Sequence, residues 1–314
     1  MNISAIVPTL NEALYISDVI EVFLNNAPEP SEIFVVDGGS TDGTFQVVNL
    51  LMQRYTNVHW VNNPKQYVSP GFNACFSRTT GKYICLLGAH ARYDQNYFQI
   101  CFQALERGEA DVVGGFLKQE GEGIFGNALA FAMSSKVGVG NTEFRTMRKR
   151  MFVDSVAFAL YRRSIFDNIG LLDEELVRNQ DDELHYRINK YGYSILMIPE
   201  VTSTYQVRSS VKALWRQYFD YGFYKPLVIK KVNKSLRFRH VIPAVFVIYL
   251  FTLMIGFFYL FWLFPLILYV ILICSVSILG YPNMRIYLNR VLAFVILHIS
   301  YGSGFIRGFI KFFR

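Results

Sequence analysis

The sequence predicts an α/β domain with a mostly parallel sheet, followed by a C-terminal part that associates with a membrane. The sheet is predicted because short apolar runs rich in strand-forming residues alternate with helix-spaced segments over roughly the first 118 of the 314 residues. The membrane part is predicted because residues 241–280 contain no Asp, Glu, Lys or Arg. Three parts are therefore expected: a domain over 1–205, a basic segment over 206–240 and a membrane domain over 241–314.

The first part reads as strands and helices in alternation. Strands are expected at Ile3–Val7, Ile33–Asp37, Val58–Val61, Tyr83–Leu87 and Asp111–Leu117. Helices are expected between them at Asn11–Asn26, Thr44–Tyr55, Gly71–Thr80 and Tyr97–Arg107. Because parallel strands need a crossover connection, this order predicts a parallel sheet with helices on both faces.

The alternation loosens after residue 118. We expect a helix at Gly121–Ser135, a polar and basic loop at Gly138–Arg150, a strand at Val153–Leu160 and a short helix at Ser164–Ile169. A helix at Asp181–Tyr191 and a strand at Ser194–Ile198 follow. From Ser210 the apolar spacing fits an amphipathic helix that lies in a bilayer interface.

The net charge of +7 is concentrated directly before the apolar run. Between Tyr205 and His240 there are nine Lys and Arg residues and one acid, Asp220. A basic block beside a hydrophobic stretch is typical of the positive-inside pattern and of contact with anionic lipids. A basic patch also suits nucleic acid, but this position favours membrane lipids, and no nucleic-acid partner is expected.

The apolar run, Val241–Gly280, is long enough for two membrane passes, with a reversal expected near Trp262–Pro265. A third segment, 286–306, contains Arg290, His298 and a Gly302–Gly304 break. Basic residues flank both of its ends, so a third span and a re-entrant hairpin both remain open.

The N-terminus has neither a basic leader nor a cleavable apolar core. We therefore expect the first domain in the cytoplasm and a multi-pass anchor in the inner (cytoplasmic) membrane. The four cysteines (Cys75, Cys85, Cys101 and Cys274) show no metal-ligand spacing and no disulfide framework.

The stretch V-V-D-G-G-S-T-D-G-T, Val35–Thr44, carries the sharpest signal. It reads as a buried strand that ends in a tight turn and opens a helix, with Gly38 and Gly39 allowing unusual backbone angles. Asp37 follows the strand at the edge where open α/β sheets bind ligands. This predicts a nucleotide site, and the alternative is an ordinary strand–turn–helix corner.

Four motifs together resemble the family 2 glycosyltransferases: I-V-P-T-L-N-E (Ile6–Glu12), Val35–Thr44, G-F-N-A (Gly71–Ala74) and N-Q-D-D-E-L (Asn179–Leu184). The resemblance extends over most of residues 1–205 and implies a GT-A-like nucleotide-binding domain. R-H-V-I-P, R-Q-Y-F-D-Y-G and S-Y-G-S-G-F further resemble membrane-tethered, succinoglycan-type members that build bacterial surface polysaccharide.

The resemblance implies roles for individual residues. Asp181 would be the catalytic base, with Gln180 standing where a Glu is usual. The donor nucleotide would be bound by Pro8, Thr9, Glu12, Asp37, Gly71 and Asn73, with Asp37 accepting the uracil imide N–H. Asp154 and Glu183 would face the acceptor. The alternatives are an exposed first-turn acid for Glu12, a helix-start residue for Asn73 and a solvated acidic helix start for 181–183.

The resemblance also implies a divalent metal, Mg²⁺ or Mn²⁺, held by a D-x-D or D-x-H element. Here L-G-A-H-A-R-Y (Leu87–Tyr93) has Gly88 in place of the first acid and retains His90. A lone His suits a hard cation poorly. Three interpretations remain: the diphosphate holds the metal with help from His90 and Asp94; Arg145, Arg148, Lys149 and Arg150 neutralise the phosphates; or the enzyme is impaired. His90 is alternatively a hydrogen-bonded loop histidine, and 145–150 a solvated or lipid-facing loop.

These features predict an inverting glycosyltransferase that moves a single sugar from a nucleotide-sugar, expected to be a UDP-sugar, to a lipid-linked saccharide acceptor. Leu214–Tyr218 (L-W-R-Q-Y) differs in order from the Q-x-x-R-W of processive synthases, which favours a single addition. The alternative is a catalytically impaired relative that binds nucleotide or scaffolds a polysaccharide-assembly complex. A sugar-nucleotide pyrophosphorylase is disfavoured, because the Gly-rich basic loop such enzymes carry near the N-terminus is missing.

Overall fold

The computed structural model describes residues 1–140, 142–207, 210–232, 236–256 and 260–314. Arg208 and Lys234 of the expected basic segment lie outside these ranges. The chain divides into two compact units, 1–118 with 147–205 and 119–146 with 206–314. Residues 119–146, which the expected 1–205 domain would include, thus belong to the second unit.

The first unit is built on a mixed sheet whose strands run in the order β3-β2-β1-β4-β8-β6-β9-β5, with β7 paired to β9. Its strands are β1 (Ile3–Thr9), β2 (Glu32–Asp37), β3 (Val58–Asn62), β4 (Tyr83–Leu86), β5 (Ala91–Tyr93), β6 (Val112–Glu120), β7 (Met151–Phe152), β8 (Leu160–Arg162) and β9 (Ile195–Gln206). β1 to β4 are mutually parallel, and β8 pairs antiparallel with β4 and β6. The predicted α/β class is confirmed.

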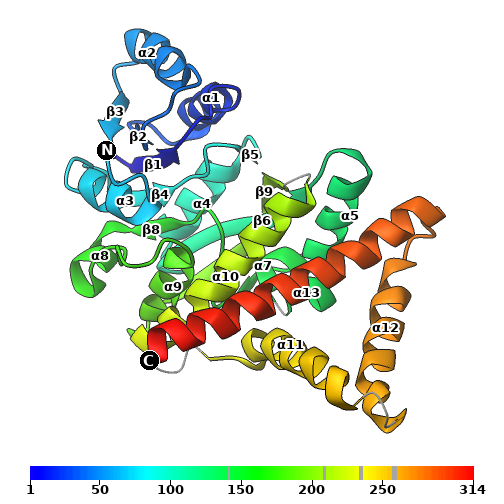
Figure 1. Ribbon diagram of the computed structural model, residues 1–314. Helices are drawn as coiled ribbons and strands as arrows, with labels where there is room; N and C mark the ends of the chain where they lie inside the picture. The colour runs from blue at the N-terminus through cyan, green and yellow to red at the C-terminus, as the bar shows by residue number, and fades with distance from the viewer. Residues whose placement is uncertain (141, 208–209, 233–235, 257–259) are drawn as a thin grey trace. The chain divides into compact units, whose positions relative to one another are not determined.

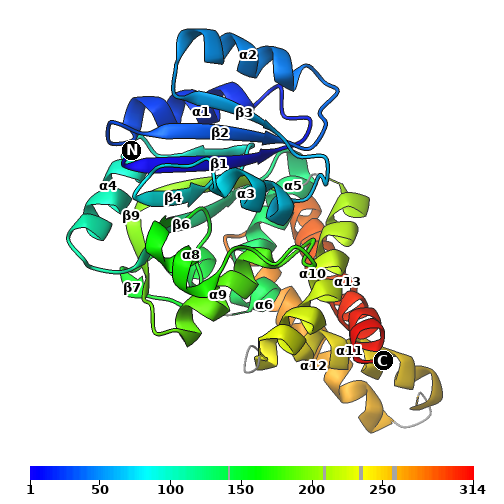
Figure 2. The ribbon, with the colours of Figure 1, turned by 90° about the vertical axis from the view of Figure 1, so that its left-hand side faces the viewer.

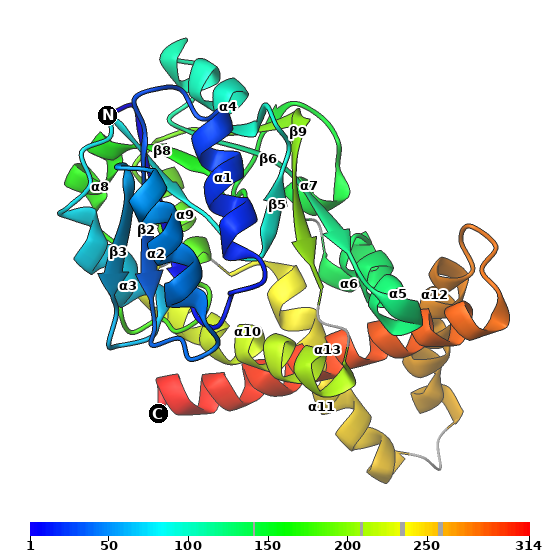
Figure 3. The ribbon, with the colours of Figure 1, turned by 90° about the horizontal axis from the view of Figure 1, so that it is seen from above.

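Helices cover both faces of the parallel strands. They are α1 (Ile16–Asn26), α2 (Thr44–Arg54), α3 (Val68–Phe76), α4 (Tyr97–Glu106), α8 (Arg163–Ile169) and α9 (Gln180–Lys190). α1 and α2 lie side by side on one face (Figure 3), where Val35 joins their buried side chains in one core. The neighbouring Val36 points to the opposite face, against α3. Figure 2 shows these strands with the helices around them.

The strand expected at Val153–Leu160 is wrong. Only Met151–Phe152 and Leu160–Arg162 are strands, and the segment between them is a loop in which Phe158 has a left-handed backbone, φ +50°. The apolar pattern arises because side chains of this loop are buried, and not because the segment pairs in the sheet; the buried residues are Val153, Val156 and Ala159. The loop expected at Gly138–Arg150 contains two short helices in part, α6 (Lys136–Val139) and α7 (Glu143–Thr146).

The second unit is helical in the part that the structure describes. Its longer elements are α5 (Gly123–Met133), α10 (Val211–Lys231), α11 (Phe238–Gly256), the 3₁₀ helix η1 (Leu260–Leu263), α12 (Phe264–Ser277) and α13 (Met284–Phe313). α10 lies along α13 (Figure 1). Trp262–Pro265 belong to η1 and the start of α12, where Pro265 occupies the first turn of the helix, which proline tolerates. The reversal expected near these residues stays a prediction, because residues 257–259, just before them, lie outside the described ranges.

α13 runs without interruption through Gly302, Ser303 and Gly304, so the expected break is absent. These glycines permit close helix packing instead. A Cβ at Gly304 would lie 2.1 Å from the Phe219 carbonyl oxygen of α10, and one at Gly302 would lie 2.2 Å from the Pro243 carbonyl oxygen of α11. Small residues that bring helix backbones together are typical of helix pairs in membranes.

Two polar residues of α13, Arg290 and His298, make hydrogen bonds within this unit. Arg290 donates to the carbonyl oxygens of Ser277 (3.0 Å), the last residue of α12, and of Leu279 (2.6 Å), just beyond that helix. His298 makes hydrogen bonds with the Val137 carbonyl oxygen (2.8 Å) and the Tyr269 hydroxyl (3.0 Å). Charged and polar groups in an apolar helix are thus paired within the unit.

Two helical segments among the described residues are long and apolar enough to cross a membrane, Leu260–Ser277 and Met284–Phe313. The first is about 30 Å long, close to the thickness of a bilayer core. Its apolar side chains are largely exposed, including Phe264, Ile267 and Ile271. Such a surface suggests association with a membrane.

The glycine packing of α13 predicts the effect of Gly304→Ala. The added methyl would collide with the backbone of α10, so the free energy of unfolding of the detergent-solubilised chain should fall by about 1–3 kcal/mol. Ser303→Ala, one residue away, is the matched control and should be close to neutral. Equal midpoints of thermal unfolding for Gly304→Ala and wild type would contradict the close packing.

Candidate functional site

Parallel pairing of β1 and β2 brings two of the predicted site residues side by side. Thr9 is the register partner of Asp37, and Pro8 is the partner of Val36. The Gly38 amide donates to the Thr9 carbonyl oxygen at 2.9 Å, which continues the pairing past the strand ends. We call this place, with the loops that follow β1, β2 and β4, the carboxyl edge; ligands of open α/β sheets bind at such an edge.

The loops after β1 and β2 are tied together by polar side chains. Asn11 has a left-handed backbone, φ +56°. Its side-chain oxygen accepts from the Thr41 backbone amide (2.8 Å), and its backbone N–H donates to the Ser40 hydroxyl (2.8 Å). Asp42 accepts from the Ala13 amide (3.1 Å) and from the Thr44 hydroxyl (2.5 Å). The hydrogen bond from Thr44 lowers the pKa of Asp42. The two loops therefore form one polar framework.

Asp37 shapes its own turn. Its carboxylate accepts from the backbone amides of Gly39 (2.8 Å) and Ser40 (3.0 Å) and from the Ser40 hydroxyl. Gly39 has φ +93°, an angle that glycine adopts without strain. The side chain is almost fully buried, so the carboxylate is fixed in place, with lone pairs beyond those used by the turn.

Two residues predicted separately, Glu12 and His90, meet at the carboxyl edge. The His90 Nδ1 lies 2.8 Å from a Glu12 carboxylate oxygen, although the residues are 78 positions apart. Both side chains are partly exposed, 34% for His90 and 18% for Glu12. A carboxylate on Nδ1 fixes the ring orientation and leaves Nε2 as the ring nitrogen for a further partner.

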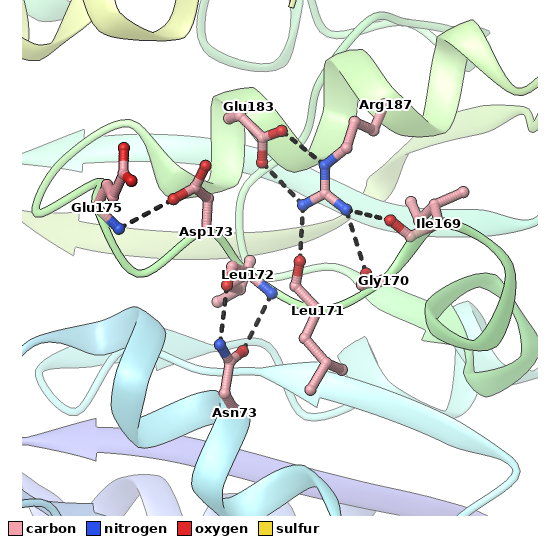
Figure 4. A network of polar contacts seen from close by, with 9 residues as sticks. All are labelled: Asn73, Ile169, Gly170, Leu171, Leu172, Asp173, Glu175, Glu183 and Arg187. Carbon is pink, nitrogen blue, oxygen red and sulfur yellow. Dashed lines mark hydrogen bonds and ion pairs between the residues drawn. The ribbon is translucent and has the colours of Figure 1, made fainter. Parts of the chain in front are cut away.

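Gly71 and Asn73 have packing and tethering contacts. A Cβ at Gly71 would lie 2.7 Å from the Asn63 side-chain nitrogen and 2.8 Å from Val36, so glycine allows α3 to approach the sheet. The Asn73 amide donates to the Leu172 carbonyl oxygen (2.8 Å) and accepts from the Leu172 amide (3.1 Å), as Figure 4 shows. Asn73 thereby fixes the loop that leads to α9.

The same loop is held from its other side by α9. Arg187 makes a two-point ion pair with Glu183, at 2.6 and 2.8 Å, and donates to the carbonyl oxygens of Ile169 and Leu171 (Figure 4). Glu183 is only 3% exposed. Its carboxylate is therefore engaged by Arg187 and holds α9 to this loop, and the acceptor-side role expected for Glu183 stays a prediction.

Asp181 is exposed in the first turn of α9. The loop before it contacts the segment that follows β3, through Lys65 with Glu174 (2.7 Å) and the Ser69 hydroxyl with the Leu176 carbonyl oxygen (3.3 Å). Because that segment starts from the carboxyl edge, these contacts draw the beginning of α9 toward the same edge.

The sequence prediction missed His185. This histidine is 1% exposed and makes hydrogen bonds with the Tyr161 hydroxyl (2.9 Å) and the Ser155 hydroxyl (3.0 Å). Burial lowers its pKa, against the opposing effect of the Asp181 and Asp182 charges. Its position four residues after Asp181, on the same helix face, is the signal that could have identified it.

Asp154 lies next to Ser155 in the loop before β8, and its carbonyl oxygen accepts from the Asn189 side chain of α9 at 2.9 Å. The basic run 145–150 is dispersed. Arg150 pairs with Glu109, before the start of β6, and Arg148 donates to the Thr202 hydroxyl at 2.9 Å. Arg150 is thus engaged away from the carboxyl edge.

A resident divalent metal does not fit the residues present. Within the ranges that the structure describes, no three His, Cys, Asp or Glu side chains are grouped so that they could hold a metal ion. His90 is bonded to Glu12, and Asp94 accepts from the Thr202 amide (2.7 Å). Hard divalent cations prefer several oxygen ligands, and this donor set does not supply them.

Comparison with known proteins identifies relatives of this chain, one of them along nearly its whole length. The model of the family described as Glycosyl transferase family 2 matches residues 4–170. The succinoglycan biosynthesis protein ExoA of Rhizobium meliloti is 33% identical over 221 residues, covering 69% of this chain and 67% of that protein. A dolichyl N-acetyl-alpha-D-glucosaminyl phosphate 3-beta-D-2,3-diacetamido-2,3-dideoxy-beta-D-glucuronosyltransferase of Methanococcus voltae is 26% identical over 319 residues, covering 98% and 97%.

A solved structure shares the fold. The mannosyltransferase PcManGT from Pyrobaculum calidifontis, in complex with GDP-Man and Mn²⁺, superposes with a TM-score of 0.63 at 15% identity, covering 96% of this chain and 86% of that one. At this identity the likeness shows the GT-A-like fold alone.

The tether at Asn73 predicts the effect of Asn73→Leu. The substitution leaves the Leu172 amide and carbonyl without their partner, which should lower the free energy of unfolding by about 1–3 kcal/mol. Ser77→Ala, at an exposed position beyond the same helix, is the control. Denaturant unfolding measures both, and an unchanged midpoint for Asn73→Leu would show that the loop does not depend on this contact.

Buried His185 predicts a pH dependence of stability. Because burial lowers its pKa in the folded state, the unfolded chain binds a proton first as the pH falls below about 6.5. The contribution to stability is therefore complete above about pH 6.5 and is lost at lower pH. Thermal unfolding between pH 5 and 8 should show this decline in wild type and a weaker one in His185→Gln; identical profiles would refute it.

Proposed function

Because the chain belongs to glycosyl transferase family 2 and is thus a glycosyltransferase, we propose that it moves a single sugar, with inversion, from a nucleotide-sugar to a lipid-linked acceptor. The donor is a UDP-sugar, and the product serves bacterial surface polysaccharide. The observation that carries the proposal is the grouping of Thr9, Asp37, Glu12 and His90 at the carboxyl edge, to which the loop before Asp181 also leads.

The donor assignment is supported by the form of the carboxyl edge. Asp37 is a buried, fixed acceptor beside Thr9, and such a group suits the N–H of a base. Gly71 and Asn73, assigned to the donor by resemblance, support it indirectly: Gly71 lets α3 approach the sheet, and Asn73 fixes the loop before α9.

The acceptor assignment is supported by the second unit and by the Methanococcus voltae relative. That relative aligns over 98% of this chain, which includes the C-terminal helices, and its name gives a dolichyl-linked sugar phosphate as its acceptor. In our proposal α11 and η1–α12 are two spans, α13 is the third membrane segment, and the anchor keeps the first unit at the cytoplasmic face. Confinement to a bilayer raises the effective concentration of a lipid acceptor.

Inverting transfer needs one carboxylate that takes the proton of the acceptor hydroxyl while its oxygen attacks the anomeric carbon. The nucleoside diphosphate leaves from the opposite side with the bonding electron pair. We assign the proton transfer to Asp181, which is exposed at the start of α9 and does not share the ion pair that occupies Glu183. Asp154, whose neighbour Ser155 contacts His185, remains our candidate on the acceptor side.

Asp181→Asn tests this assignment. Nucleotide binding, measured by titration calorimetry on the solubilised full chain with UDP, should stay within about twofold, whereas transfer should fall by about 10²–10⁴-fold. Transfer is read as radiolabelled lipid product from a panel of nucleotide-sugars with membranes that contain the chain. Asp182→Asn removes the same charge from the next residue and should retain most activity.

Full turnover by Asp181→Asn would refute Asp181 as the base. If the chain is instead a catalytically impaired relative, wild type should bind nucleotide and form no labelled lipid with any donor.

A further inference from the structure

The place of the first metal acid in this chain is filled by an aromatic ring. A Cβ built at Gly88 would lie 2.8 Å from Cε1 and 3.0 Å from Cζ of Phe158, and 3.4 Å from the Ala91 Cβ. Contacts below 3.0 Å do not occur for real Cβ atoms without a shift of the neighbour. A carboxylate side chain at position 88 is therefore excluded unless Phe158 moves.

Phe158 is partly buried, and two tyrosines contact it. Its ring meets the edge of the Tyr93 ring at 5.5 Å and 78°, and the Tyr97 hydroxyl donates to its carbonyl oxygen at 3.0 Å. Tyr93 in turn accepts from the Gly88 amide at 2.9 Å, and Tyr97 is fully buried. The ring contact with Tyr93 and the hydrogen bond from Tyr97 to the backbone of Phe158 favour the observed placement of the ring over Gly88.

His90, two residues after Gly88, has one ring nitrogen that can bind an anion. Glu12 engages its Nδ1, which leaves Nε2 as the atom for a further partner. One imidazole is a weak ligand for Mg²⁺ or Mn²⁺, whereas an imidazole N–H can donate to a phosphate oxygen, more strongly when the ring is charged.

We propose that Phe158 closes the metal position and that the chain binds the diphosphate of its donor without a divalent ion held by the protein. His90, oriented by Glu12, is the side chain that contacts the diphosphate. The identity of this ligand as a nucleoside diphosphate rests on the proposed function, whereas the closure of the metal position by Phe158 does not.

Mn²⁺ binding to the solubilised full chain, without nucleotide, tests the closure. It is measured by the loss of the electron paramagnetic resonance signal of free Mn²⁺. Wild type, Gly88→Asp and Phe158→Gly should leave the signal as in buffer. Gly88→Asp/Phe158→Gly, which supplies the acid and removes the ring, should bind Mn²⁺ at least about tenfold more tightly than wild type. Glycine suits position 158 because its φ is +50°.

Two outcomes overturn the closure. One is stoichiometric Mn²⁺ binding by wild type that His90→Gln abolishes. The other is a folded double variant, judged by circular dichroism, that binds no more Mn²⁺ than wild type. If the double variant misfolds, Gly88→Asp/Phe158→Ala takes its place with the same expectation.

Calorimetry with UDP and with GDP tests the role of His90. Wild type should bind one of them equally in EDTA and in Mn²⁺, to within about twofold, and His90→Gln should weaken this binding about tenfold. Binding that requires Mn²⁺ overturns the proposal. Failure to bind either nucleotide refutes the donor assignment of the proposed function, and the Mn²⁺ titration still decides the closure.

Discussion

The pairing of β1 with β2 is the constraint on which the rest of the site depends. Its register sets Thr9 against Asp37, and the Gly38 amide extends the pairing one residue beyond the strands. A slip of one residue would turn every side chain of a strand to the other face. All β2 side chains are buried, with Val35 packed with α1 and α2 and Val36 against α3, so such a slip would disrupt packing on both faces, and the core supports the geometry of the carboxyl edge.

Polar tethers extend this precision to parts of the chain far away in sequence. Asn73 and Arg187 hold opposite sides of the loop before α9, and each does so through backbone atoms of that loop. Because these contacts are made to backbone atoms, they fix the path of the loop and place little restriction on its side chains. The position of Asp181 thus depends on contacts that do not involve Asp181.

Much of the fold was predictable because its signals are local. Strands that alternate with helices, and the turn at Gly38–Gly39, depend on residues that are neighbours in sequence. The wrong predictions concern sequence patterns that two different structures can produce. Val153 and Val156 have the apolar pattern of a strand but are buried in a loop, and Gly302 and Gly304 predict a break but allow helices to pack closely.

The residues of the candidate site could be predicted only where they belong to a sequence motif. Asp37 and Asp181 could be proposed from sequence, but no pattern shows that Glu12 meets His90 or that Phe158 covers Gly88. The resemblance assigns Asn73 and Glu183 to ligands, and the structure shows both engaged with other parts of the protein. A motif alone does not distinguish a binding group from a structural tether.

Hydrogen exchange of the full chain with and without UDP-sugar tests the central claim, that donor binds at the carboxyl edge of β1 and β2. The account predicts slower exchange of amides in 9–13 and 37–44, where the two loops share their polar framework. Protection confined to other segments, with these two unchanged at saturating nucleotide, would contradict it.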